Sequence, residues 1–388
     1  MIEYALLFLL LPLAAVSGWL VGQGQTRRRS RRRAALSSQY FRGLNYLLNE
    51  ESDKAIEEFV KLAEVNRDTV DTHLALGTLF RRRGEMDKAI RYHKHILSRP
   101  NLDEDQRERV LFELAMDYMR AGLLDRAESL FLELTDSDEI STRARRHLLD
   151  IYQQEKDWAK AVEQAQRLDL LDGGLDTGLI AHLYCELADE ALVMGDTLAA
   201  TQHLRQARRY QPQNARARLI EAGIAERDGQ PGLAAERYRE ACELDPDLLV
   251  RCMTRLVDCH RAADRIGSLK AWLGSGALRV DFNAPILLLA RLTAENDPEQ
   301  AAELLLQALE KRCTVRGLEY LMTLLNSHDL GLSEVGPELI RDLMQRLLQG
   351  QPVYRCEQCG FSGSAHHWMC PSCRSWNSTR VIRGVLGE

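Results

Sequence analysis

The sequence predicts an all-α chain in which helical hairpins stack into a right-handed solenoid, followed by a small module built around four cysteines. Two observations carry this prediction. Small residues recur at intervals of 34 residues through most of the chain, and two C-x-x-C pairs lie close to its carboxyl end. The 388 residues are enough for two or three domains, and 45% hydrophobic residues is ordinary for globular protein. A folded chain of several parts is therefore expected.

The repeat is easiest to follow from one small residue in each unit. These residues are Ala55, Ala89, Ala127, Ala161, Ala200, Ala234, Ser268 and Ala302, at intervals of 34, 38, 34, 39, 34, 34 and 34. Twelve positions before each of them stand Gly43, Gly77, Ala115, Leu149, Ala188, Ala222, Leu256 and Ala290. Small residues at both places would let two helices cross closely, so that each pair buries its apolar face against its neighbours. The 34-residue period resembles the tetratricopeptide family, and the predicted solenoid covers residues 37–349.

The turn inside each repeat also has a recognisable sequence. Glycine is expected to end the first helix, and aspartate to begin the second. Three units show this pattern, at Gly84 with Asp87, Gly122 with Asp125, and Gly195 with Asp196. The fourth unit has Lys156 in place of the glycine, and residues 314–349 are expected to form two further helices as a degenerate cap.

The amino-terminal segment predicts a membrane anchor. Tyr4–Val21 holds 18 residues without a charge, which is long enough to cross a bilayer, and six arginines follow within residues 27–33. Because cationic flanks stay on the cytoplasmic side, residues 1–22 are predicted to span the membrane with the amino terminus outside, and residues 23–36 to form a basic linker. A cleaved signal peptide is the alternative, since Ala15-Val16-Ser17 has the small residues of a cleavage site. Its basic region should precede the apolar run, however.

Gly18 and Gly22 lie inside the predicted anchor, four residues apart. This spacing lets two membrane helices approach closely, so the pair is a candidate contact for helix packing. Small residues are also common in membrane helices, and chance is the alternative explanation. A homo-oligomer therefore remains open.

The two cysteine pairs suit one tetrahedral metal ion, either iron or zinc. Cys356 and Cys359 are separated by ten residues from Cys370 and Cys373. Four thiolates close the coordination sphere and leave no position for a substrate, which favours a structural role. His366 or His367 in place of one cysteine is the alternative ligand set.

The tail of the chain resembles rubredoxin and zinc-ribbon modules through Tyr354–Phe361 and Trp368–Cys373. Residues 350–388 are predicted to form this module. Such modules commonly have glycine after the fourth cysteine, where this chain has Arg374. Because only residues 350–353 link the module to the last predicted helix, it is expected to pack on the end of the solenoid.

Composition and motifs exclude several classes of function. The net charge of -6, the isoelectric point near 6.0 and the 6% aromatic content argue against a nucleic-acid partner. No phosphate-binding loop, H-E-x-x-H or G-x-S-x-G motif is present, so an enzyme of these classes is not expected. Candidate partner-binding residues on the concave side of the solenoid are Arg81, Arg82, Met119 and Arg120, which would favour an acidic segment. Ordinary solvated helix faces are the alternative.

The order of anchor, repeats and four-cysteine module resembles the lipopolysaccharide assembly protein B family of Gram-negative bacteria. The stretches that carry the resemblance are Leu9–Pro12 with Gly18-Trp19, His73–Arg81, Asp117–Leu123 and Tyr354–Trp376, so it spans essentially the whole chain. The tail of that family is similar to Cys-Pro-Ser-Cys-Arg, which accounts for Arg374. The family's metal cysteines correspond to Cys356, Cys359, Cys370 and Cys373.

The resemblance implies a regulator on the cytoplasmic side of the inner membrane. It implies a single-pass adaptor, periplasmic at its amino terminus, that presents the deacetylase committing material to lipid A to a membrane-anchored AAA+ metalloprotease. It also implies contacts with other membrane proteins of lipopolysaccharide assembly and export. A rubredoxin-type electron carrier that docks its partner through the solenoid is one alternative. A periplasmic assembly chaperone is another, and it would require the reversed topology.

Overall fold

The computed structural model describes two compact units, which divide the chain between Gly173 and Gly174. The residues described are 41–43, 45–46, 54, 57–58, 70–327 (without 101, 138, 173–176, 277, 279–282 and 313), 341, 344–346 and 348–384. The predicted anchor and basic linker, with Gly18 and Gly22, lie outside these residues. None of the helices within the described ranges combines the length and apolar character that a bilayer crossing requires.

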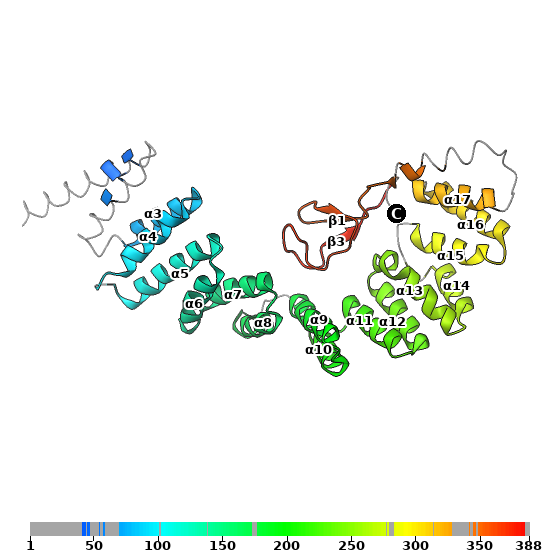
Figure 1. Cartoon of the computed structure of the whole chain (residues 1–388), viewed down its shortest axis with the longest axis horizontal. Coiled ribbons are helices and arrows are strands. Elements are labelled where there is room, and N and C mark those ends of the chain that lie inside the picture. The colour runs from blue at the N-terminus through cyan, green and yellow to red at the C-terminus, as the bar shows by residue number, and fades with distance from the viewer. Residues whose placement is uncertain are drawn as a thin grey trace, which may run out of the picture. The chain divides into compact units, whose positions relative to one another are not determined.

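The first unit consists of successive helical hairpins (Figure 1). Its elements are α3 (Val70–Arg82), α4 (Met86–Leu97), α5 (Glu104–Arg120), α6 (Leu124–Glu133), the 3-10 helix η2 (Leu134–Asp136), α7 (Ser141–Glu155) and α8 (Trp158–Asp172). The helices pair as the 34-residue period predicts: α3 with α4, α5 with α6 and α7 with α8.

The predicted small residues lie where the paired helices touch. Ala89, Ala127 and Ala161 are fully buried, and a Cβ atom added to Gly77 would lie 2.1 Å from Nε2 of His93 in the partner helix. Any larger side chain at position 77 would force the His93 ring to move. Close helix crossing therefore requires the small residue, as the sequence predicts.

The turns follow the predicted glycine rule, with one extension. Gly84 and Gly122 have φ values of 82° and 75°, and Lys156 reaches the same left-handed region at 60°. The fourth unit therefore forms the same turn without glycine, although the left-handed conformation costs a residue with a Cβ about 1–2 kcal/mol.

The aspartate half of the turn rule is only partly right. Asp196 precedes α10, and its side chain accepts a hydrogen bond from the backbone of Ala199. Asp87 and Asp125 instead lie inside the first turns of α4 and α6 and do not cap them. The N-cap residue of the second helix lies four positions before the repeat alanine. Of the three aspartates, only Asp196 occupies this position. Asp87 and Asp125 still stabilise their helices, because a negative charge in the first turn interacts favourably with the positive end of the helix dipole.

The second unit continues the helical pairs and ends in a small sheet. Its helices are α9 (Thr177–Val193), α10 (Thr197–Tyr210), α11 (Ala215–Arg227), α12 (Pro231–Leu244), α13 (Leu248–Ala262), α14 (Ile266–Gly274), α15 (Ala284–Ala294), α16 (Pro298–Lys311) and α17 (Val315–Ser327). Helix α17 confirms the first helix of the predicted cap; most of the second lies outside the described residues.

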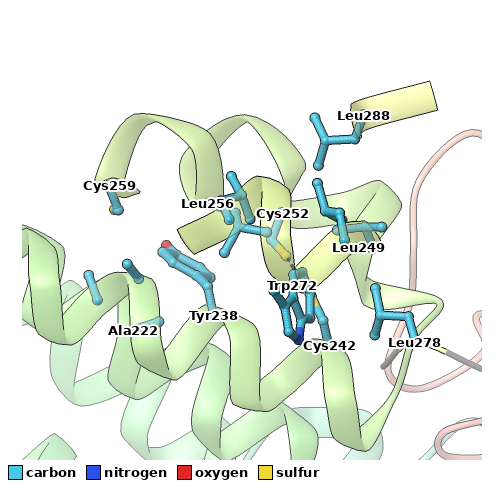
Figure 2. Close-up of a cluster of buried hydrophobic side chains, with 14 of the residues drawn as sticks. Ala222, Tyr238, Cys242, Leu249, Cys252, Leu256, Cys259, Trp272, Leu278 and Leu288 are labelled. Carbon is cyan, nitrogen blue, oxygen red and sulfur yellow. Dashed lines mark hydrogen bonds between the residues drawn. The ribbon is translucent and has the colours of Figure 1, made fainter. Parts of the chain in front are cut away.

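One continuous apolar cluster joins α11 through α15 (Figure 2). Tyr238 and Trp272 supply its large rings, and the Sγ atoms of Cys242 and Cys252 lie 3.4 Å apart among them. The two thiols are buried and form no disulfide, so they pack as small, weakly polar residues. In the seventh unit Ser268 is exposed, and Leu269 takes the buried place expected there.

The module at the carboxyl end is a three-stranded antiparallel sheet. Its strands are β1 (Tyr354–Cys356), β2 (Ser362–Gly363) and β3 (Thr379–Val381), in the order β2-β1-β3. Tyr354 pairs with Gly363 on one side and with Val381 on the other. The central strand thus delivers Cys356 to the cysteine cluster.

Candidate metal centre and its contacts with the repeats

Two similar loops hold the four cysteines. In the first, the backbone of Gly360 donates to the carbonyl of Cys356, and Gly360 has a φ of 78°. In the second, the backbone of Arg374 donates to the carbonyl of Cys370, and Arg374 has a φ of 60°. Arg374 therefore takes the left-handed conformation that glycine takes in the first loop, so the missing glycine does not prevent the second loop from forming.

The sulfur atoms have the spacing of a metal site. All four Sγ atoms lie within 4.8 Å of one another, and the pairs Cys356–Cys373 and Cys359–Cys370 are each 3.7 Å apart. A tetrahedral ion with metal–sulfur bonds of about 2.3 Å requires sulfurs roughly 3.8 Å apart. A disulfide requires about 2.05 Å. The donor set therefore fits one thiolate-bound ion, and the geometry suits iron as well as zinc.

Hydrogen bonds already favour the thiolate form of two of these cysteines. The Ser378 hydroxyl lies 3.3 Å from Cys356 Sγ and is the main cause that lowers the pKa of Cys356 to about 6. Ser375 lowers the pKa of Cys373 in the same way. Burial raises the pKa of Cys370 to about 11, so this thiol needs the charge of a metal to ionise at neutral pH.

Aromatic rings of the module rest on the first helices of the repeats. The ring of His182 in α9 stacks on Trp376, with centroids 5.4 Å apart and 18° between the planes, and also contacts Trp368. The guanidinium carbons of Arg216 in α11 and Arg251 in α13 lie 5.4 and 5.5 Å from the Trp368 centroid. Cations at these distances are attracted by the face of an indole.

Ion pairs from the strand β3 region of the module also contact the repeats. Arg380 donates to Asp245 at 3.0 Å, and Arg383 donates to Asp247 at 3.1 Å. The backbone of Val381 also donates to Asp247, whose side chain is almost fully buried in the connection before α13. Partly buried pairs of this kind position the module more than they add stability.

These contacts correct the expected position of the module. Within the described residues its partners lie on α9, α11 and α13 and in the connection before α13, and not on α16 or α17. Sequence reasoning missed the residues concerned. The tryptophans at 368 and 376 and the arginines at 380 and 383 were the available signal, since a module this small exposes such side chains unless a partner covers them.

The buried His182 predicts a pH-dependent stability of the second unit. Burial, followed by the charge of Arg216, lowers the pKa of His182 to about 3. Between pH 6.5 and 3 the unfolded chain therefore binds a proton that the folded chain excludes, so stability is complete above pH 6.5 and declines as the pH falls through this window. We expect the midpoint of thermal unfolding to fall more steeply from about pH 7 to pH 5 in the wild type than in His182→Gln.

The comparison of slopes isolates the histidine. Burial raises the pKa of Asp245, and protonation of this carboxyl makes the folded chain more stable as the pH falls. The wild type and His182→Gln share this contribution, so it cancels when their slopes are compared. Tryptophan fluorescence measured during heating follows the contact directly. Parallel pH profiles in the two proteins would show that His182 does not titrate on unfolding.

The candidate partner-binding residues fall into two groups. Arg82 and Arg120 are exposed and Met119 is partly buried, whereas Arg81 is engaged inside the first unit. Arg81 donates to Glu113 at 2.5 Å and to the buried Asp117 at 2.7 Å. Partner binding by the four residues stays a prediction, with Arg82 and Arg120 the more available of the arginines.

Fold and site together define a tetratricopeptide repeat protein with a rubredoxin-like metal-binding module. The family model for the rubredoxin metal-binding domain matches residues 354–380, and the tetratricopeptide repeat model matches residues 112–174 and 185–248. The chain belongs to the lipopolysaccharide assembly protein B family. It is 34% identical to lipopolysaccharide assembly protein B of Escherichia coli K12 over 98% of this chain and 99% of the relative.

The chain is also similar to a second relative in sequence and, weakly, to a solved structure. The lipopolysaccharide assembly protein B of Haemophilus influenzae is 31% identical over 97% of this chain and 98% of its own. A solved tetratricopeptide repeat protein from Parabacteroides merdae aligns with 72% of this chain and 99% of its own, at 12% identity and a TM-score of 0.34. The family assignment rests on the two relatives, since the structural likeness is too low to support an argument.

Proposed function

We propose that this chain is an inner-membrane adaptor that regulates lipopolysaccharide synthesis. In this proposal it holds the lipid A-committing deacetylase for a membrane-anchored AAA+ metalloprotease and connects synthesis with the export proteins. The observation that carries the proposal is similarity along 98% of the chain to a protein named for lipopolysaccharide assembly. Helical repeats suit this task because they offer long surfaces for protein contacts.

The proposed topology places residues 1–22 in the membrane, the amino terminus in the periplasm and the repeats in the cytoplasm. A tether of this kind keeps the scaffold beside a membrane protease and raises the effective concentration of a bound client. The proposed metal ligands are Cys356, Cys359, Cys370 and Cys373, which would hold one iron or zinc ion. The ion would cross-link the two cysteine loops, and side chains of the protein would bind the client.

Two variants test the adaptor role in cells. Deletion of Tyr4–Val21 removes the tether, and the double replacement Cys356→Ser with Cys359→Ser removes half of the metal ligands. Both are expected to raise the cellular level of the deacetylase, measured by immunoblot after synthesis is stopped. Cys259→Ser is the matched control, because this buried cysteine lies outside the metal cluster. Degradation that proceeds unchanged in both variants would contradict the adaptor proposal.

Electron transfer is the second candidate function, and one observation favours it. Cys359 and Cys373 are exposed, so a metal bound here would have one edge open to a redox partner. The metal content and visible spectrum of the purified protein distinguish the two functions. Zinc, or a spectrum that does not change on reduction, would exclude electron transfer, whereas reversible bleaching of an iron–thiolate band would support it.

A further inference from the structure

A pocket of about 310 Å³ lies in the second unit where the repeats meet the metal module. Residues of the first helices α9, α11 and α13 form most of its lining, and Trp368 of the module forms one wall. Tyr238 adds a second aromatic wall, and Leu219 and Ile220 add apolar surface. The volume is at the small end of the range typical of sites for small molecules.

Positive charge dominates the pocket. Its charged lining residues are Arg216, Arg227, Arg251, Arg255 and Asp189. Arg216 is almost fully buried and forms ion pairs with Glu186 at 3.0 Å and with Asp189 at 2.7 Å. The only acidic lining residue is thus already engaged with the most buried arginine.

Among the described residues, the other three guanidinium groups form no direct ion pair, although the charge of Glu226 acts on Arg255 from a distance. In the part of the chain that the structure describes, no ion pair joins Arg227, Arg251 or Arg255 to a carboxylate. Arg251 contacts His366 at 3.1 Å and the face of Trp368, and Arg255 contacts Tyr238, all of which are neutral partners. Burial and the neighbouring charge of Arg216 both lower the pKa of Arg251. An anion in the pocket would relieve this repulsion.

We propose that the pocket binds the phosphate group of a small organic phosphate, with Arg227, Arg251 and Arg255 as its ligands. A phosphate monoester carries close to two negative charges and three acceptor oxygens, which three planar guanidinium groups can share. A single carboxylate would neutralise only one of them. The aromatic and apolar walls then take the organic part of the ligand, which inorganic phosphate would leave unfilled.

The phosphate can come from a soluble metabolite or from a lipid headgroup, and calorimetric titration separates the two. The full chain in detergent is titrated with inorganic pyrophosphate, glycerol 3-phosphate and dihexanoyl phosphatidic acid, with dihexanoyl phosphatidylcholine and a short oligoglutamate peptide as comparisons. Binding of the first two probes assigns a soluble ligand, and binding of phosphatidic acid alone assigns a lipid headgroup. Preferred binding of oligoglutamate, or no binding of any phosphate probe, would overturn the proposal.

Two variants assign the binding to this pocket. Arg255→Gln removes an exposed guanidinium and is expected to weaken binding of the phosphate probe about tenfold. Arg209→Gln is the matched control, since Arg209 is an exposed arginine of the second helix α10 and does not line the pocket. Circular dichroism and metal content establish that both variants are folded. Equal affinity in the two variants would place the binding elsewhere and refute the site.

Discussion

A chain with serine at both Cys356 and Cys370 is expected to lose its metal and the fold of residues 354–380. These two cysteines come from different loops and are the buried pair of the cluster. Serine cannot supply a thiolate, and two remaining sulfurs do not close a tetrahedral site. Structural zinc contributes about 10–16 kcal/mol to the folding of small modules, far more than three strands of two or three residues can replace.

The loss should extend from the module to the repeats. Trp376 and Trp368 would leave His182, and the aspartates beside α13 would lose Arg380 and Arg383. Metal analysis measures the loss of the metal, and hydrogen exchange of residues 354–380 measures the loss of the module's fold. Cys185→Ser should retain the metal, because Cys185 is buried in α9 away from the cluster. Slow exchange of the module in a metal-free double variant would contradict the structural role.

Asp117→Ala is expected to destabilise the first unit by about 3 kcal/mol, because removing one partner of a buried ion pair strands the others. The Asp117 side chain is completely buried. It accepts hydrogen bonds from Arg81 at 2.7 Å and from Nδ1 of His93 at 2.5 Å. Alanine would leave His93 without its buried acceptor and Arg81 with Glu113 as its remaining ion-pair partner.

Thermal or urea unfolding followed by circular dichroism measures this effect. For a unit of this size the midpoint should fall by roughly 6–12 °C. Asp71→Ala is the matched control, since Asp71 also pairs with an arginine between α3 and α5 but both side chains are exposed. It should change stability by less than about 1 kcal/mol. Equal midpoints for the two variants would show that the Asp117 cluster contributes no more than a surface pair.

The sequence predicts those features that depend on local spacing. The helical hairpins follow from the 34-residue recurrence, and the cysteine cluster follows from two short loops with the same internal geometry. Lys156 shows the limit of the turn rule, because the surrounding hairpin imposes a left-handed residue even where glycine is absent. Ser268 shows a similar limit, since the period places the unit correctly but misses the buried position by one residue.

The docking of the module could not be predicted in this way. Arg380 and Asp245 are 135 residues apart in the chain, and no repeat or motif relates them. The short linker favoured the end of the solenoid, whereas the ring contacts of the two partly buried tryptophans and the paired charges place the module on earlier helices. For Arg81 the sequence indicated a residue on the concave helix face, but it did not reveal that Glu113 and Asp117 of α5 form ion pairs with this arginine.

The metal module and the first helices of the second unit pack together as one folded body. Hydrogen exchange of the metal-loaded chain tests this most directly when Asp245→Arg is compared with the double variant Asp245→Arg, Arg380→Asp. The single change places two arginines against each other, so faster exchange is predicted in both α13 and residues 354–380. The double change restores an opposite pair and should restore the slow exchange. Wild-type exchange rates in the single variant, with metal retained, would contradict a docked module.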